Sequence, residues 1–279
     1  MKIGCHVSIA GGVFNAPANA HALGCEVFQI FSRSPRGGPA LALSKDIIEQ
    51  FWSEMKKYEY SEFVIHTPYY INFGSKNKSI SHTSARIIRE ELGRATLLGS
   101  PYVMTHMGSF KDLGRSAGLA QLVDGLFETL NTYRGNAQLL LEISAGAGEV
   151  MGGDFEQMAE ILEHRKLRKF RLGVCFDTAH AFASGYDLRD ASSVNKTLRE
   201  FDLAIGLENL KVMHANDSKV GLGEKRDRHD HIGSGKIGKA GFRALLHHPK
   251  LKKVNMYLET EHDRVKEDIA ILKELRGKS

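Results

Sequence analysis

Residues 172–180 read Leu172-Gly173-Val174-Cys175-Phe176-Asp177-Thr178-Ala179-His180, and the class of fold can be inferred from them. The first five residues form a short apolar run, which is typical of a buried strand. The run leads directly into Asp177, and His180 follows three residues later. Two strong metal ligands therefore stand at the carboxyl end of a predicted strand, which is where parallel (β/α)₈ barrels place their active sites.

Seven further runs of this kind are spread along the chain, and segments with helical periodicity lie between them, as at residues 47–55 and 119–130. Together with Leu172–Phe176, the predicted strands are Lys2–Val7, Val27–Phe31, Phe63–His66, Tyr102–Thr105, Leu139–Ile143, Leu210–His214 and Met256–Thr260. Strand and helix alternate without a break in composition. We therefore predict one domain, residues 1–279, folded as a closed α/β barrel of the (β/α)₈ TIM type with parallel strands. An open doubly wound sheet is the alternative fold.

The composition is typical of a globular protein, since 42% of the 279 residues are hydrophobic, 25% are charged and only 6 are proline. Its 38 basic residues exceed its 33 acidic ones, and the resulting net charge of +5 is compatible with an anionic partner. No apolar run is long enough to span a bilayer and no targeting pattern is present, so we expect a cytoplasmic protein without a membrane partner, acting as a monomer. Three cysteines without a C-x-x-C pair argue against a disulfide framework. We expect Cys5, Cys25 and Cys175 to be reduced, buried thiols.

Reactive side chains recur at the ends of the predicted strands. Six of them stand at or just after the carboxyl ends of six different strands: His66, His106, Glu142, Asp177, His214 and Glu259. His180 follows Asp177 after a turn, and the pair Asp227 and His229 lies in the loop after the strand that ends at His214. Alternate residues of an extended loop point the same way, so this pair can also chelate an ion. Because strand ends of a barrel meet at one mouth, we predict a metal site there.

Any one of these side chains alone is more simply interpreted as a hydrogen-bonded core or loop residue. Five histidines and four carboxylates together would be a costly concentration of polar groups without cations. Mixed imidazole and carboxylate ligands suit zinc, with manganese or iron as substitutes. Since a catalytic zinc keeps about three protein ligands, nine residues call for about three ions. Three Zn²⁺ ions and four carboxylates would leave a charge of about +2, which matches one hydroxide and one phosphodiester and favours phosphoryl transfer to water.

Long motifs connect these residues to a known family. They are Gly4–Gly12, Phe176–Asp187, Met213–Lys219, Arg226–Gly233 and Tyr257–Thr260. In order and length they closely resemble the signatures of the endonuclease IV family of abasic-site endonucleases, and the resemblance extends over the whole chain. It implies a zinc-dependent endonuclease of base excision repair. Such an enzyme hydrolyses the phosphodiester 5′ to abasic sites in double-stranded DNA and leaves a 3′-hydroxyl and a 5′-deoxyribose phosphate.

The resemblance also implies how the nine ligands divide among three zinc ions. The implied sets are His66, His106 and Glu142 for the first, Glu142, Asp177, His214 and Glu259 for the second, and His180, Asp227 and His229 for the third. Glu142 would bridge the first two ions and is the predicted catalytic residue. His231 competes with His229 for its role, but the Asp-x-His spacing favours His229.

Members of this family bend the duplex, flip the abasic nucleotide out and insert side chains from loops at the mouth. The matching positions here are Arg36, Tyr69 and Tyr70, which the resemblance assigns to DNA binding. Directly after Arg36 the chain departs from the family pattern, because Gly37-Gly38-Pro39 replaces the customary aromatic and basic residues. All nine ligand positions are kept.

Two other classes of protein are compatible with a metal-binding barrel. One is a metal-dependent sugar isomerase or epimerase of the xylose-isomerase-like class, whose sites are usually rich in carboxylates and hold one or two ions. Five histidines argue against it. The other is a DNA-damage-binding barrel with structural metals, which would need closed coordination that nine ligands do not give to three ions.

Overall fold

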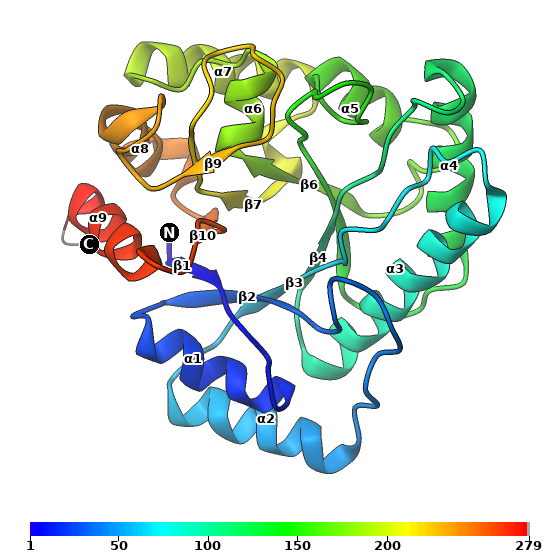
Figure 1. Cartoon of the computed structure of the whole chain (residues 1–279), viewed down its shortest axis with the longest axis horizontal. Coiled ribbons are helices and arrows are strands. Elements are labelled where there is room, and N and C mark those ends of the chain that lie inside the picture. Colours follow the sequence, from blue (N-terminus) through cyan, green and yellow to red (C-terminus); the bar gives the residue numbers. More distant parts are fainter. Residues whose placement is uncertain (278–279) are drawn as a thin grey trace.

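A computed structural model describes residues 1–277 and shows a ring of strands surrounded by helices (Figure 1). The eight strands of the ring are parallel and close in the order β1-β10-β7-β6-β5-β4-β3-β2. Their bounds are β1 (Ile3–His6), β2 (Val27–Phe31), β3 (Phe63–His66), β4 (Tyr102–Thr105), β5 (Gln138–Glu142), β6 (Leu172–Asp177), β7 (Leu210–His214) and β10 (Asn255–Leu258). The predicted (β/α)₈ barrel is therefore confirmed, and the alternative of an open sheet is wrong.

The strands lie within two residues of their predicted positions. The largest difference is at β10, which ends at Leu258 and not at Thr260. The backbone N–H of Glu259 donates to the side-chain oxygen of Asn216 (2.8 Å) and not to a neighbouring strand. Glu259 therefore lies just beyond its strand, at the mouth of the barrel.

Helices cover the outside of the barrel (Figure 1). Their bounds are α1 (Ala16–Ala22), α2 (Lys45–Lys57), α3 (Lys78–Leu98), α4 (Arg115–Asn131), α5 (Phe155–Leu162), α6 (Thr178–Ser184), α7 (Ala191–Ala204), α8 (Gly238–His247) and α9 (Val265–Arg276). The two periodic segments, residues 47–55 and 119–130, lie in α2 and α4 as predicted. Ser44 fixes the start of α2, because its side chain accepts a hydrogen bond from the N–H of Ile47. None of the helices in residues 1–277 is long and apolar enough to cross a membrane.

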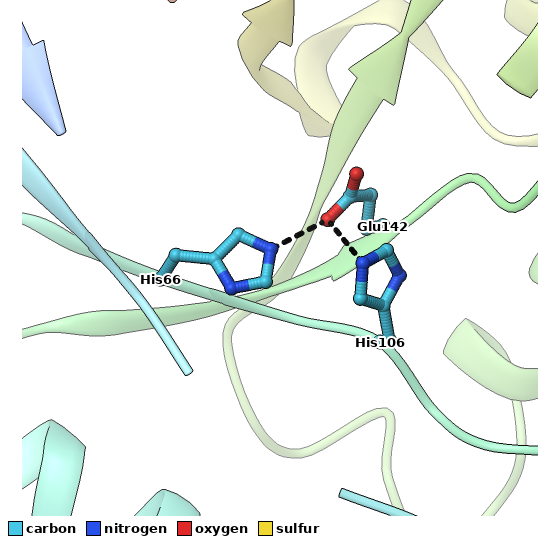
Figure 2. Close-up of side chains that lie close together, drawn as sticks. All are labelled: His66, His106 and Glu142. Carbon is cyan, nitrogen blue, oxygen red and sulfur yellow. Dashed lines mark hydrogen bonds and ion pairs between the residues drawn. The ribbon is translucent and has the colours of Figure 1, made fainter. Parts of the chain in front are cut away.

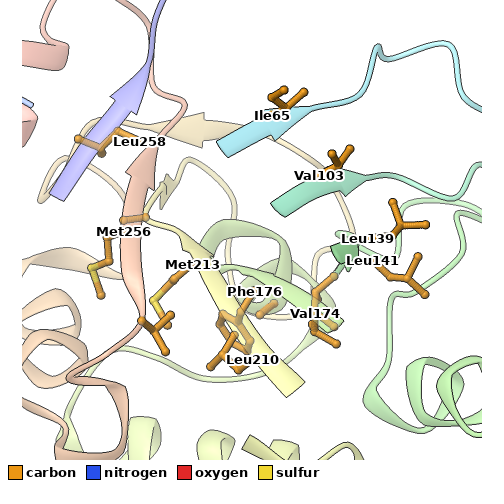
Figure 3. Close-up of a cluster of buried hydrophobic side chains, with 14 of the residues drawn as sticks. Ile65, Val103, Leu139, Leu141, Val174, Phe176, Leu210, Met213, Met256 and Leu258 are labelled. Carbon is orange, nitrogen blue, oxygen red and sulfur yellow. The ribbon is translucent and has the colours of Figure 1, made fainter. Parts of the chain in front are cut away.

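The apolar core has two layers, one between the strands and the helices and one inside the barrel. Figure 3 shows part of the outer layer, where Ile65, Val103 and Val174 point away from the barrel axis. The inner layer takes one side chain from each of seven strands: Val27, Val64, Met104, Leu140, Cys175, Val212 and Tyr257. The eighth strand, β1, contributes Gly4 beside Val27 and Tyr257. Any side chain there would collide with the carbonyl oxygen of Val27, which is 1.6 Å from an ideal Cβ.

The three cysteines are free thiols in the structure. Burial is confirmed for Cys5 and Cys175 and is wrong for Cys25, which is half-buried because it lies in the turn between α1 and β2. The sulfur atoms of Cys5 and Cys25 are 3.5 Å apart.

The chain after β7 contains a hairpin that the sequence did not predict. Strand β8 (Asp217–Ser218) pairs in antiparallel orientation with β9 (His229–Asp230). The buried carboxylate of Asp217 accepts a hydrogen bond from the N–H of Ile237 (2.9 Å), just before α8, and so ties the chain that follows the hairpin back to β8. The hairpin therefore holds His229 in a fixed position relative to the barrel.

Candidate metal centre

The polar side chains at the mouth form the inward-facing layer above the apolar inner layer. Successive side chains of a strand alternate between its two faces, so the residue two positions after an inward-facing one also points inward. Two positions after Gly4 and the seven inner-layer residues stand His6, Gln29, His66, His106, Glu142, Asp177, His214 and Glu259. Six of these eight residues are predicted metal ligands. Strand alternation and barrel closure thus gather them at one end of the barrel.

The first group of ligands joins β3, β4 and β5 (Figure 2). The Nε2 atoms of His66 and His106 both face Oε2 of Glu142, at 3.1 Å and 3.6 Å. On the other side of its ring, His66 Nδ1 donates to the carbonyl oxygen of Thr67 (2.6 Å). This hydrogen bond leaves the lone pair of Nε2 directed at the centre of the group, which is the state that a metal requires.

The second group uses the other oxygen of the same carboxylate. Nδ1 of His214 lies 3.0 Å from Oε1 of Glu142, 3.3 Å from Oε2 of Glu259 and 3.8 Å from Oδ2 of Asp177. Glu142, Asp177 and His214 are completely buried. Glu142 therefore stands between two groups of ligands, with one oxygen turned toward each.

The third group joins α6 to the hairpin. Nε2 of His180 lies 3.2 Å from Oδ1 of Asp227, and Nε2 of His229 lies 3.4 Å from the same oxygen. The two Nε2 atoms are 3.4 Å apart. Asp177 also approaches this group, with Oδ2 at 3.7 Å from His229 Nε2. The third group is more open than the other two, since the side chain of Asp227 is 55% exposed.

The mouth of the barrel carries an excess of negative charge. Burial disfavours the charged form of Glu142, but His106 and His214 hold the pKa of its carboxyl well below the usual range. Burial likewise opposes ionisation of Glu259, yet His214 lowers its pKa to about 2. Within residues 1–277, no lysine or arginine forms an ion pair with any of the four carboxylates. The negative charges of Glu142 and Glu259 are therefore not balanced by a lysine or an arginine, and a bound cation would neutralise them.

The donor atoms fit divalent metal ions. A tetrahedral ion with bonds of about 2.1 Å holds its ligand atoms about 3.4 Å apart. The three donor atoms of His180, Asp227 and His229 are separated by 3.2–3.4 Å. In the first group, and in the second, all donor atoms lie within 4.8 Å of one another. The residues present thus suit the metal centre that the sequence predicts.

One further grouping brings the thiol of Cys175 close to Glu142 and His214. Cysteine binds metals as a thiolate. Burial raises the pKa of the Cys175 thiol to about 12, so this residue stays protonated and belongs to the apolar layer below the site.

Two of the predicted DNA-binding residues border the metal groups. Tyr69 is 64% exposed, and its ring lies 5.1 Å from Phe31 and 6.1 Å from His66. Tyr69 and Tyr70 line a cavity of about 500 Å³ that His106, His180 and Asp227 also line. Arg36 is exposed in a separate hollow, of about 640 Å³, which Tyr70 borders from the other side. Tyr70 therefore connects the metal cavity to the hollow that holds Arg36.

The competing histidine, His231, lies outside the three groups. Its Nδ1 contacts Oδ2 of Asp268 in α9 at 2.7 Å, and its Nε2 contacts Oδ1 of Asp263 at 3.3 Å. The structure therefore brings His229 to the third group and leaves His231 to hold the end of the hairpin against α9.

Sequence reasoning missed three polar residues that lie at the mouth beside the predicted ligands. Gln29 and His6 belong to the same inward-facing layer, and the alternation of β1 and β2 is the signal that could have found them. Asn216 follows β7 and donates through Nδ2 to Oδ2 of Asp177 (2.7 Å). No periodic pattern indicates Asn216, because it lies in the loop between β7 and β8.

Comparison with known proteins identifies the family of this chain. Residues 17–275 match the family described as xylose isomerase-like TIM barrel. The chain is 41% identical over 270 residues to a probable endonuclease 4 from Nitrosopumilus maritimus, and this match covers 96% of each of the two chains. The crystal structure of endonuclease IV from Thermus thermophilus matches with a TM-score of 0.86 and 34% identity, over 99% of this chain and 98% of that one. A D-tagatose 3-epimerase-like protein matches with a TM-score of 0.72 at 22% identity, over 99% and 97%, which shows a shared fold alone.

Proposed function

This chain belongs to the endonuclease IV family, and we propose that it is a zinc-dependent endonuclease that hydrolyses the phosphodiester 5′ to abasic sites in double-stranded DNA. Its products would be a 3′-hydroxyl and a 5′-deoxyribose phosphate. The observation that carries the proposal is the carboxylate of Glu142, which faces His66 with one oxygen at 3.1 Å and His214 with the other at 3.0 Å. A shared carboxylate between two ligand groups is suited to adjacent divalent ions, and such centres serve phosphoryl transfer.

We assign about three zinc ions to the three groups of ligands, with manganese or iron as substitutes. When bound, the ions supply positive charge to the phosphodiester and activate water. Glu142 would provide one carboxylate oxygen to each of the first two groups. His180 and His229 would provide ring nitrogens to the third group beside them. Most ligands of the first two groups are buried, so charges there interact more strongly than they would in water.

The DNA would approach along the open side of the mouth. Tyr69 offers an exposed aromatic ring beside the first group, and base–aromatic stacking is a sequence-tolerant contact. Arg36 offers a positive charge in the neighbouring hollow. We further propose that residues 1–279 form one catalytic domain that acts as a monomer in the cytoplasm.

The proposed activity is tested with metal-analysed protein and a labelled duplex that carries one synthetic abasic site, without added magnesium. We expect a single cut on the 5′ side of the site, a 3′-hydroxyl end and about three zinc ions per chain. The same duplex without the abasic site should stay intact. Intact abasic DNA in the presence of fully metal-loaded protein would contradict the proposal, and turnover of a ketose would then indicate a sugar isomerase.

His229→Ala should remove the third ion and leave the other two. Its ring is one of three donors in that group, whereas the first two groups do not contain it. We expect the zinc content to fall from about three to about two per chain and cleavage to fall by at least about 100-fold, because a bound ion contributes several kcal/mol to such a transition state. Elemental analysis and single-turnover cleavage measure both. His82→Ala removes an exposed imidazole on α3 and is the matched control. Unchanged zinc in His229→Ala would exclude His229 as a ligand.

Tyr69→Ala and Arg36→Ala should weaken DNA binding without changing the metal content. Loss of one stacking contact costs about 1–3 kcal/mol, so we expect the Kd for a non-cleavable abasic duplex to rise by about 10-fold in Tyr69→Ala. Fluorescence anisotropy measures this change. Arg134→Ala, an exposed arginine near the start of β5 and so at the opposite end of the barrel, is the control for charge. Binding equal to that of the wild type would remove the mutated residue from the DNA contacts.

A further inference from the structure

Gln29 stands among the ligands of the second group although it bears no charge and belongs to no predicted set. It is the inward-facing residue of β2 at the mouth and is completely buried. Its amide contacts three side chains from three other strand ends. Nε2 lies 2.7 Å from Oε1 of Glu259 and 3.1 Å from Nδ1 of His6, and Oε1 lies 2.9 Å from Nε2 of His214.

These contacts fix which end of the amide faces which partner. The Glu259 carboxylate can only accept a hydrogen bond, so the NH₂ end of Gln29 must face it. The carbonyl end then faces His214, and a carbonyl oxygen can only accept. Nε2 of His214 must therefore carry a hydrogen. His6 accepts the second N–H of the amide through Nδ1 (3.1 Å), whereas turning the amide over would set its carbonyl oxygen against the Glu259 carboxylate.

The position of this hydrogen decides what the other side of the His214 ring can do. A neutral imidazole carries one hydrogen, so a ring that is protonated at Nε2 has a free lone pair at Nδ1. Nδ1 is the atom that faces Glu142 at 3.0 Å and Glu259 at 3.3 Å. The opposite tautomer would direct an N–H at the centre of the second group and exclude a metal ion from it.

We propose that Gln29 is a positioning residue that holds His214 in the tautomer able to bind a metal through Nδ1, with His6 fixing the orientation of the Gln29 amide. The inference rests on the proposed function in so far as the second group holds an ion. It adds a residue from β2 to a centre whose predicted ligands come from the ends of six other strands, from α6 and from the hairpin. Partners that orient a metal-binding histidine typically contribute 10- to 100-fold to metal affinity or activity.

The first test observes the tautomer directly. Long-range ¹H–¹⁵N correlation of the histidine rings in zinc-loaded wild-type protein should show His214 protonated at Nε2 and without hydrogen at Nδ1. Gln29→Met keeps the length of the side chain but removes both the donor and the acceptor, so its His214 signals should lose this pattern at a lower chelator concentration than those of the wild type. A zinc-loaded wild-type His214 that carries its only hydrogen on Nδ1 would overturn the inference, whatever the enzyme does to DNA.

The second test follows the metal. Protein loaded with zinc is titrated with a chelator, and the ions that remain are counted. We expect Gln29→Met to lose one ion at a roughly 10- to 100-fold lower chelator concentration than the wild type, while the other ions stay in place. Gln138→Met, the same change at the opposite end of β5, should behave as the wild type does. His6→Ala is the second variant, and we expect a smaller shift in the same direction because the Gln29 amide keeps two of its partners.

The outcomes separate this inference from the proposed function. A wild type that cleaves abasic DNA and binds about three zinc ions, together with a Gln29→Met variant that retains all of them equally well, overturns the role of Gln29 alone. A wild type that binds no zinc overturns the proposed function. The melting temperature of each metal-free variant shows that it is folded before either result is interpreted.

Discussion

Glu142→Gln should reduce cleavage of abasic-site DNA by at least about 1000-fold while the protein stays folded. Its two oxygens face two groups of ligands, so one substitution removes a charged donor from both. The loss of about 4 kcal/mol of transition-state stabilisation corresponds to that factor, and one ion alone contributes several kcal/mol. Single-turnover cleavage and zinc content per chain measure the effect.

The melting temperature of Glu142→Gln should change far less than its cleavage rate does. In the metal-free protein, Gln keeps the shape of the buried side chain but loses the charge interactions with His106 and His214 that hold the pKa of the Glu142 carboxyl well below its usual range. We therefore expect a lower melting temperature than that of the wild type, with the protein still folded. Glu160→Gln makes the same chemical change on the surface of α5, where the carboxylate contacts Arg115 at 3.3 Å, and should leave cleavage unchanged. Turnover of Glu142→Gln near the wild-type rate would rule out its bridging role.

Removal of zinc should abolish cleavage completely but slowly. Four of the six ligands in the first two groups are buried, so a chelator reaches those ions slowly. Imidazole and carboxylate ligands bind metals only when deprotonated, and protons therefore compete with zinc as the pH falls. We expect faster inactivation at about pH 5 than at about pH 7.5, with release of zinc in parallel.

The metal that restores activity is the decisive part of this experiment. Five of the predicted ligands are histidines, and imidazole suits zinc or iron far better than magnesium. Zinc should restore cleavage to the stripped protein, whereas magnesium should not. Instant loss of activity at neutral pH followed by recovery in magnesium would show that the centre is of another kind. Circular dichroism before and after stripping distinguishes loss of metal from loss of fold.

Local sequence patterns were sufficient to predict the barrel of this protein. Each strand of the barrel is a short apolar run, and burial on both faces is what produces such a run in a parallel sheet. The predicted ligands could be found in the same way. A charged residue that ends an apolar run marks the mouth of the barrel, as Asp177 does after Leu172–Phe176. These signals depend only on residues that are close in the sequence. They can therefore be recognised without knowledge of the fold.

Local sequence patterns were insufficient to predict the contacts of Gln29 or the hairpin of β8 and β9. Within Val27–Phe31, Gln29 is one polar residue in an apolar run, and 185 residues separate it from His214. Only closure of the barrel, which sets β1 between β2 and β10, brings these side chains together. In the sequence, only the Asp-x-His spacing favours His229 over His231, whereas in the structure β9 pairs with β8 and Asp268 in α9 binds His231.

Short stretches of the chain were enough to predict the alternation of strands and helices, the single barrel and the identity of the nine candidate ligands, because periodicity and residue chemistry are local properties. Resemblance to a family, and not periodicity, divided those ligands into three sets. Three facts came from the folded molecule: Glu142 turns one oxygen to each of two groups, His229 reaches the third group, and Gln29 holds the His214 ring. They depend on side chains that lie far apart in the chain, and only the closed ring of strands places these within hydrogen-bonding distance.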